Sequence, residues 1–166
     1  DFTDKHRKDI TAAVIVCSDT ISGGQKEDRA GKAIIKKLKE CDVIISDYIV
    51  IPDETDDIQK RAHYYQKQAV DLIIYTGGTG LSKRDVTPEA LMPLLNRRIP
   101  GIEEAIRAYG QNRTPYSMLS RSIAGTIGNS LVIALPGSTN GAKESMDALF
   151  PAILHIFRIL KGAQHD

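Results

Sequence analysis

The sequence predicts an α/β fold in which a mostly parallel sheet carries helices on both faces. The short run at residues 10–17 has the continuous hydrophobicity of a strand buried on both faces, and the β-rich run at 43–51 and the short run at 72–75 are predicted to be further strands. Segments with helical periodicity separate these runs, and the resulting β-α-β-α-β order is typical of parallel sheets. The loops at the carboxyl ends of such strands meet at one edge of the sheet, where ligands usually bind. Functional residues are therefore expected in those loops.

The first half of the chain alternates regularly. The strand at 10–17 is followed by the loop "SDTISGGQKEDRAG" and then by a helix. The strand at 43–51 ends at Pro52, which has no amide hydrogen to continue a sheet ladder. A second helix then leads to the strand at 72–75. The apolar faces of the two helices are marked by Ala30, Ala33, Ile34 and Leu38 in the first and by Ile58, Ala62, Tyr65 and Ala69 in the second.

Proline and glycine mark the next two helices. One is predicted to begin with Thr87 as its N-cap and Pro88 at its first helical position, since proline fits the first turn and threonine caps it. The other follows Gly101 through "IEEAIRAYG" and closes at Gly110.

The last third is less regular. A strand at 131–135 follows a turn at Gly128-Asn129, and a shorter strand is predicted at 123–126. In the last helix Pro151 introduces a kink or a split, because proline interrupts the helical hydrogen bonds. Its apolar face is formed by Ile153, Ile156, Phe157 and Leu160.

Composition favours a single soluble domain, 1–166, located in the cytoplasm. Twenty-two basic and 21 acidic residues give a net charge of +1, so no global field attracts nucleic acid or an anionic membrane. Cys17 and Cys41 suit neither a metal cluster nor a disulfide scaffold and are interpreted as buried fillers. Residues 1–9, expected to form a flexible segment, lack the apolar core of a signal peptide. The chain begins with Asp1 and is either trimmed or one domain of a longer polypeptide.

A loop rich in glycine follows the strand at 72–75. Its residues 76–80, "TGGTG", remove side chains from a sharp turn, so that free backbone N–H groups can surround phosphate oxygens. Lys83 stands too far from the last glycine for a Walker motif, and the spacing also differs from G-x-G-x-x-G. A tight turn without a ligand explains the glycines equally well.

Two further loops supply charge and hydroxyl groups. Asp85 in "KRD" and Asp53 with Glu54 in "IPDE" would reach the same sheet edge, where carboxylates and phosphates together can bind magnesium. Alternatively, Asp85 supports the dipole of the next helix, and Asp53 flanks a helix as well. The loop "PGSTNGA" could bind an anion at the start of the last helix, or Ser138 or Thr139 could simply cap that helix.

These segments together resemble the MogA/MoaB family of molybdenum cofactor biosynthesis proteins, which also occurs as the G domain of gephyrin-like proteins. The strongest match is "TGGTGLSKRDVTPEAL", residues 76–91. The shorter segments "VCSD", "IPDE", "MLSRSIAG" and "LPGST" follow the order of the family, and the resemblance spans about residues 10–161. The final "PGST" is closer to the MoaB branch.

The resemblance implies a three-layer α/β/α sandwich that binds molybdopterin and transfers AMP from Mg-ATP to its phosphate, releasing pyrophosphate. Asp53 and Asp85 match the two catalytic aspartates of the family, and they are expected to hold Mg²⁺ or to orient the reacting phosphate. Such a transfer depends on positioning and on neutralised charge. The expected substrate contacts are Ser18, Asp19, Thr76, Gly77, Gly78, Thr79, Gly80, Arg84, Ser120, Arg121, Pro136, Gly137 and Ser138.

Alternatives remain open at this stage. Some proteins of the MoaB branch lack transfer activity, which leaves a carrier or scaffold that binds molybdopterin and passes it to a molybdenum-insertion protein. Related glycine loops also occur in CinA-like enzymes and in the MoeA insertion domain, although a compact single domain disfavours both. The family forms trimers or hexamers, so a homo-oligomer is expected. No nucleic-acid or membrane partner is expected, and Arg97-Arg98 is interpreted as covering a solvated helix end.

Overall fold

A computed structural model describes residues 9–160, which form one mixed sheet of six strands in the order β2-β1-β3-β6-β5-β4. The first four strands in this order are parallel to one another, and the last two run antiparallel at the edge. The prediction of a mostly parallel sheet is therefore confirmed. The strands are β1 (Thr11–Cys17), β2 (Ile44–Ile51), β3 (Leu72–Thr76), β4 (Arg97–Arg98), β5 (Ile123–Ile127) and β6 (Ser130–Leu135).

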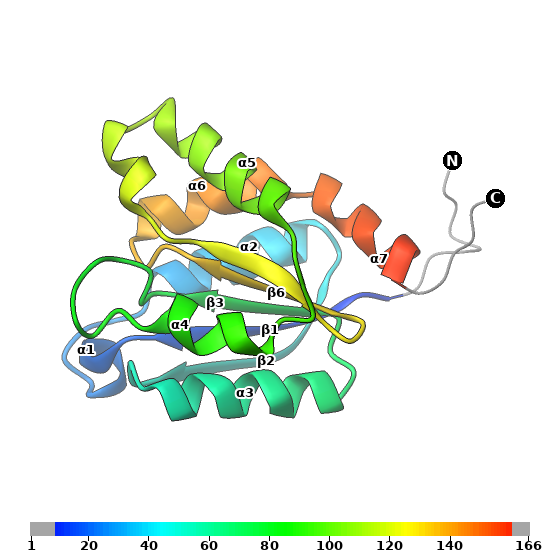
Figure 1. Ribbon diagram of the computed structural model, residues 1–166, viewed down its shortest axis with the longest axis horizontal. Coiled ribbons are helices and arrows are strands. Elements are labelled where there is room, and N and C mark those ends of the chain that lie inside the picture. The colour runs from blue at the N-terminus through cyan, green and yellow to red at the C-terminus, as the bar shows by residue number, and fades with distance from the viewer. Residues whose placement is uncertain (1–8, 161–166) are drawn as a thin grey trace.

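Helices cover both faces of this sheet and complete the expected three layers (Figure 1). One face carries α2 (Ala30–Glu40), α5 (Pro100–Gln111), α6 (Thr139–Leu149) and α7 (Ile156–Leu160). The other carries α3 (Thr55–Lys67) and α4 (Thr87–Leu91). The short helix α1 (Asp19–Ser22) follows β1, and the remaining turns are the 3₁₀ helices η2 (Met92–Leu94), η3 (Pro115–Leu119) and η4 (Ala152–His155).

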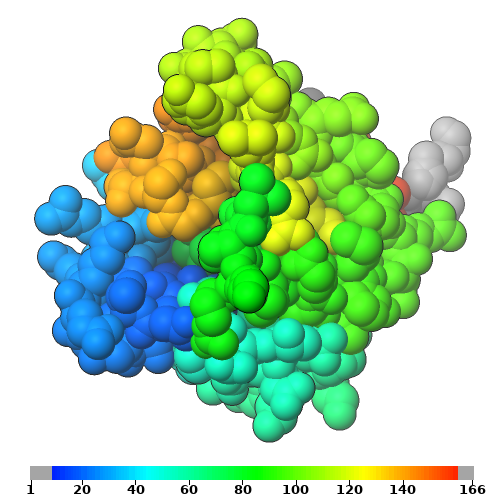
Figure 2. Space-filling view, turned by 60° about the vertical axis from the view of Figure 1, so that its left-hand side comes forward, coloured from blue at the N-terminus to red at the C-terminus, as the bar shows by residue number. Residues whose placement is uncertain are grey.

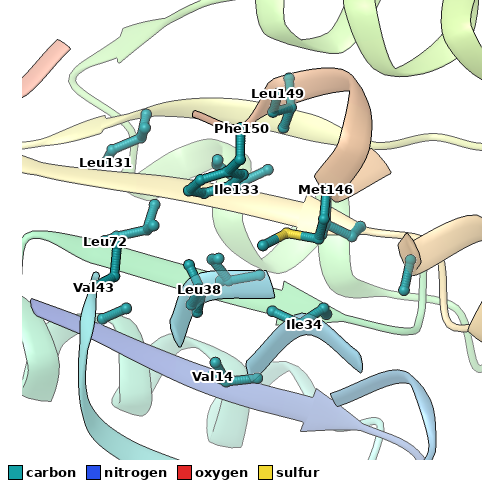
Figure 3. Packing of buried hydrophobic residues seen from close by; sticks show 14 of the residues in the cluster. Val14, Ile34, Leu38, Val43, Leu72, Leu131, Ile133, Met146, Leu149 and Phe150 are labelled. Carbon is teal, nitrogen blue, oxygen red and sulfur yellow. The ribbon is translucent and has the colours of Figure 1, made fainter. Parts of the chain in front are cut away.

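A separate apolar core lies on each side of the sheet. Figure 3 shows one of them, in which Leu38 and Met146 from the helices pack over Leu72 and Ile133 from the central strands. On the other side Ile58 and its neighbours in α3 and α4 pack against the opposite faces of the same strands. Because burying one such side chain contributes about 1.5–3 kcal/mol, the sheet is held from both faces and its loops start from a rigid base.

Several sequence predictions about single elements are confirmed. Residues 123–135 form the β5–β6 hairpin around the turn at Gly128, whose φ is +59°. The last helical segment is split near Pro151, between α6 and the η4–α7 pair. Both cysteines are free thiols; Cys17 is buried as predicted, whereas Cys41, also predicted to be buried, is only half-buried. The prediction for residues 1–9 lies, apart from Asp9, outside the described residues. None of the described helices has the length and apolarity needed to cross a bilayer.

Three predictions about single residues are wrong. Thr87 is the first residue of α4 rather than its N-cap, which is Val86, because its hydroxyl donates instead to the carbonyl of Gly77 at 2.9 Å. Ala69 lies beyond the end of α3 with a φ of +60°, so it does not extend the apolar face. Arg97-Arg98 forms the edge strand β4, since its backbone pairs with that of β5.

Candidate functional site

The loops after β1, β2, β3 and β6 meet at one edge of the sheet. Figure 2 views this face, where the green segment that contains the glycine loop lies beside the blue N-terminal residues and the orange α6. A cavity of about 240 Å³ opens here, and because four carboxylates, Glu27, Asp28, Asp53 and Asp85, line it we call it the acidic cavity. The structure thus brings these predicted site residues to one place: Ser18, Asp53, Thr76, Gly77, Gly78, Asp85, Gly137 and Ser138.

The glycine loop approaches other backbone so closely that a side chain would not fit. Gly77 has a φ of +103°, and a Cβ atom there would lie 2.3 Å from the carbonyl oxygen of Cys17. A side chain at Gly78 would press against Thr87 and fill the space beside Asp53. The backbone turn therefore needs glycine at 77, and the open space beside Asp53 needs glycine at 78.

Most backbone N–H groups of the loop are free to meet a ligand. The amide of Gly77 donates to the carbonyl of Leu135 at 3.0 Å and so belongs to the fold. Within the described chain no hydrogen-bond acceptor is found for the amides of Gly78, Thr79 and Gly80. Of these three residues only Gly78 lines the acidic cavity, whereas the predicted site residues Thr79 and Gly80 do not. Because unpaired amides in a turn can bind anions, the amide of Gly78, rather than that of Gly77, is the candidate phosphate donor.

Asp53 carries the clearest sign of a missing partner. Its Oδ2 accepts a hydrogen bond from the amide of Asp19 at 3.0 Å, and Asp19 Oδ1 accepts one from the amide of Asp53 at 2.9 Å. Asp53 Oδ1 is buried and has no hydrogen-bond partner. Burial raises the pKa of Asp53, and the nearby charges of Asp19 and Asp85 raise it further. A buried carboxylate oxygen left in this state is costly unless a cation or a donor meets it.

Arg84 links the loops that surround Asp53. Its guanidinium donates to both carboxylate oxygens of Asp19, at 2.9 and 3.0 Å, and to Glu54 at 2.8 Å. This hydrogen bonding holds the pKa of Asp19 below its ordinary value. Although the resemblance implies that Asp19 and Arg84 contact substrate, neither lines the acidic cavity. In this structure they hold Asp53 in place from outside.

Asp85 enters the acidic cavity from the far end of the glycine loop. Its Oδ2 accepts from the amide of Ser82 at 2.9 Å and from the hydroxyl of Ser82 at 2.7 Å, which ties the loop into a tight turn. No bond to Oδ1 is found among the described residues. One oxygen of Asp85 thus shapes the loop, and the other remains for a ligand.

Arg121 braces the same loop from the side. Its Nε donates to the carbonyl of Gly80 at 2.9 Å, its Nη2 donates to the carbonyl of Asp85 at 3.0 Å, and it forms an ion pair with Glu89. That pairing lowers the pKa of Glu89. Because Arg121 uses its guanidinium on the loop and lines neither cavity described here, its place is that of a support for Asp85.

A second cavity, of about 400 Å³, adjoins the first. It lies between α5 with η3 on one side and the start of α6 on the other, and we call it the α5–α6 cavity. Ser138 lines both cavities. As predicted for one of two residues, Ser138 caps α6, because its hydroxyl accepts from the amide of Gly141 at 3.0 Å. The predicted site residues Ser120 and Pro136 also line this second cavity.

Sequence reasoning missed part of the acidic cavity wall. Lys26, Glu27, Asp28 and Arg29, taken as loop residues only, line the cavity. Asp28 is buried, and its carboxylate accepts from the amide of Gly31 at 2.9 Å and from the Tyr48 hydroxyl. A charged loop has no periodicity that would place its residues, so the sequence contained no signal for this wall.

The acidic cavity suits phosphate and magnesium better than covalent catalysis by cysteine. Burial raises the pKa of the Cys17 thiol to about 12, so that it stays protonated and is a poor nucleophile near neutral pH. Among the described residues there is no cluster of three or more His, Cys, Asp or Glu side chains that could hold a metal. Magnesium commonly takes only one or two carboxylates, with phosphates and water as its other ligands. Asp53 and Asp85 with their free oxygens fit that pattern.

Comparisons with known proteins agree with this geometry. The family model described as "Probable molybdopterin binding domain" matches residues 13–155. The chain is 38% identical over 92% of its length to the molybdenum cofactor biosynthesis bifunctional protein of Chlorobaculum tepidum, but it spans only 49% of that protein. It is 35% identical to molybdenum cofactor biosynthesis protein B of Staphylococcus aureus strain COL, covering 94% of this chain and 95% of the relative.

The fold matches a solved structure equally well. The crystal structure of the molybdopterin biosynthesis enzyme MoaB from Thermus thermophilus superposes with a TM-score of 0.87 at 36% identity. The match covers 92% of this chain and 97% of that one. The sheet and the helical layers are therefore shared with that protein.

Proposed function

This chain belongs to the molybdenum cofactor biosynthesis family of molybdopterin-binding domains, and we propose that it is a molybdopterin adenylyltransferase. The observation that carries the proposal is the buried, unpartnered Oδ1 of Asp53, which lines the acidic cavity together with Asp85 and the unpaired amide of Gly78. This combination offers a place for both a phosphate and the cation that accompanies it. Molybdopterin would supply one phosphate and ATP the others.

The reaction needs few groups from the protein. An oxygen of the molybdopterin phosphate attacks the α-phosphorus of ATP, the bond from that phosphorus to the bridging oxygen breaks, and pyrophosphate leaves. A phosphate monoester, whose second pKa is about 6, is largely a dianion near pH 7, so its attacking oxygen has no proton to give up. The protein then contributes position and charge.

Each part of the acidic cavity has a task in this scheme. The amide of Gly78 would orient a phosphate oxygen, and the glycines at 77 and 78 allow the backbone to come close. Asp53 and Asp85 would hold Mg²⁺, which neutralises phosphate charge when it is bound. Arg84 and Arg121 keep the two aspartates in place through their hydrogen bonds to the surrounding loops.

Pyrophosphate release tests the proposal. The purified protein receives molybdopterin, ATP and Mg²⁺, and the Asp85→Asn variant is assayed in parallel. We expect turnover in the unchanged protein and its loss in the variant, with circular dichroism showing that the variant remains folded. Asp56→Asn is the matched control, because Asp56 is an exposed aspartate in the first turn of α3. No turnover in the unchanged protein would overturn the proposal.

A non-catalytic carrier or scaffold is the second candidate. Similarity to biosynthesis protein B over nearly the whole chain favours it, together with the "PGST" segment that resembles the MoaB branch. Molybdopterin binding that is unaffected by ATP, without pyrophosphate release, would identify this function. Both functions fit a homo-oligomer, whose size gel filtration with light scattering would determine.

A further inference from the structure

The α5–α6 cavity contains a carboxylate that has no hydrogen-bond or ion-pair partner among the described residues. Glu144, in the second turn of α6, lines the cavity and is half-buried. Neither a hydrogen bond nor an ion pair is found for it among residues 9–160. The other side chains of the cavity offer mainly hydroxyl and amide groups, from Ser117, Ser120, Ser138 and Asn140.

The basic residue that lines this cavity, Arg113, contacts Tyr109. Arg113 donates to the carbonyl of Tyr109 at 2.7 Å, and its guanidinium lies 3.6 Å from the centre of the Tyr109 ring. No ion pair between Arg113 and Glu144 is found among the described residues. A ligand that enters the cavity meets an uncompensated carboxylate, which favours hydrogen-bond donors and disfavours acceptors and anions.

The same cavity has an aromatic ring and apolar surface. Tyr116, on η3, lines the cavity and is 75% exposed, so the fold itself gives its ring little to pack against. Ile106 and Pro136 supply apolar surface to the lining. Flat heteroaromatic rings stack on exposed aromatic side chains, and a cavity of about 400 Å³ has room for a bicyclic ring.

We propose that the α5–α6 cavity holds a pterin ring and that Glu144 is the residue that selects it. Pterin presents two neighbouring donors, the N3–H and the 2-amino group, which match the two oxygens of one carboxylate. Adenine presents a donor beside an acceptor, and the acceptor would face the negative charge. Glu144 thus distinguishes the pterin substrate from the adenine of ATP.

The position of the cavity agrees with this assignment. Because Ser138 lines both cavities, a molecule with its ring near Glu144 can extend past Ser138 toward the loop amides and Asp53. The inference rests on the proposed function in that the ring is taken to be the pterin of molybdopterin. Adenine would then lie outside the α5–α6 cavity.

A pair of small fluorescent probes tests the selection by Glu144 directly. Pterin and lumazine differ only at position 2, which is amino in pterin and oxo in lumazine. We expect the unchanged protein to bind pterin roughly 10- to 100-fold more tightly than lumazine, the usual range for hydrogen bonds to a charged group. Fluorescence titration up to millimolar probe measures both affinities, and adenosine should not compete with pterin.

Two variants separate selection from packing. Glu144→Gln replaces one acceptor by a donor, so we expect pterin and lumazine to bind it with similar affinity. Glu104→Gln makes the same change at an exposed position on α5 and should keep the preference of the unchanged protein. Tyr116→Ala should weaken both probes alike, because stacking does not depend on the group at position 2.

The outcomes for this inference and for the proposed function are distinct. A pterin preference that persists in Glu144→Gln overturns the selective role of Glu144, and so does a failure of pterin to bind the unchanged protein. Neither result bears on pyrophosphate release, which decides the transfer reaction separately. A preference lost only in Glu144→Gln supports the inference even if the protein turns out to be a carrier.

Discussion

The aspartates at the two ends of the central strands differ in how their carboxylates are hydrogen-bonded. At the amino end Asp71 is buried, and its carboxylate accepts hydrogen bonds from the amide of Thr11 at 3.0 Å and the hydroxyl of Thr11 at 3.3 Å. At the carboxyl end Asp53 has one oxygen bound and one buried oxygen without a partner. Burial by itself does not mark a functional carboxylate, since Asp71 is the more deeply buried of the two. The unmet oxygen is the distinguishing feature.

Because of this difference, the polar groups at the amino end of the sheet stabilise the fold, whereas those at the carboxyl end are available for function. At the amino end, Thr11 and Asp71 form hydrogen bonds to each other, and these bonds join the start of β1 to the residue that precedes β3. The carboxyl end leaves donors and acceptors open and holds them by arginines placed outside the cavity. Groups kept unsatisfied in the folded protein lower its stability and are available to a ligand.

The largest expected effect is the loss of turnover on changing Asp53. Asp53→Asn keeps an oxygen for the amide of Asp19 but removes the charge. We expect turnover to fall roughly 10²- to 10³-fold, as when a group that stabilises charge in the transition state is removed. Pyrophosphate release measures the loss, and Asp56→Asn serves as the control. Unchanged turnover in Asp53→Asn would show that the open oxygen has no part in the reaction.

Substituting two glycines with positive φ, one at each end of the sheet, compares how strongly the backbone is constrained at the two ends. Gly77→Ala should destabilise the fold by roughly 3 kcal/mol, because its Cβ would meet the backbone oxygen of Cys17 at 2.3 Å and the backbone would also be strained. Gly128→Ala, in the hairpin turn, should cost only about 1–2 kcal/mol. There the Cβ would meet Nε2 of the Gln66 side chain, which can move.

Urea denaturation of these glycine variants gives the two free energies of unfolding. If both variants lose the same stability, the close approach of the glycine loop to β1 does not constrain residue 77.

Removing Asp71 should affect stability and spare turnover. Asp71→Ala leaves the amide of Thr11 without its acceptor, at an expected cost of about 1–3 kcal/mol. For a chain of this size that lowers Tm by roughly 2–4 °C for each kcal/mol. Turnover per folded molecule should not change, because Asp71 lies at the opposite end of the sheet from the acidic cavity. If Asp71→Ala lost turnover at temperatures well below its Tm, the idea that the amino end of the sheet serves stability and the carboxyl end serves function would be contradicted.

The smallest expected effect concerns pH. Burial raises the pKa of Asp53, so the folded protein holds this proton more tightly than the unfolded chain does. The ionised carboxylate therefore reduces stability as the pH rises from about 4, the ordinary range for an aspartate. Asp53→Asn should have a higher Tm than the unchanged protein at pH 7, and the gap should narrow toward pH 4. Differential scanning calorimetry at both pH values checks the sign, and a gap that widens on acidification would contradict it.

Local patterns were sufficient for most of the elements. The apolar runs at 10–17 and 72–75 became β1 and β3 within one residue at each end, because a strand buried on both faces must be apolar throughout. The turn at Gly128 was also predicted from its own residues. The two-residue strand β4 was missed, since its pairing with β5 depends on a segment far along the chain.

Roles inside the site were predicted less well than its location. Asp53 and Asp85 were expected at one sheet edge, and both line the acidic cavity. Thr87 was taken for a helix cap, whereas its hydroxyl binds the carbonyl of Gly77. Arg121 was expected to touch substrate, which stays a prediction, and the structure adds that it braces the loop that carries Asp85. In each case the partner depends on how the loops fold over one another.

The sequence by itself determined the order of most strands and helices, the layers of the fold and the loops expected to hold a ligand, because these follow from periodicity and from residue types over short distances. The tertiary structure decided which atoms in those loops are left free. Arg84 binds Asp19 across 65 positions, and Arg121 binds the carbonyl of Asp85 across 36. Such contacts form only after the sheet has brought the loops together, so the open oxygen of Asp53 and the unpaired carboxylate of Glu144 became visible only in the folded chain.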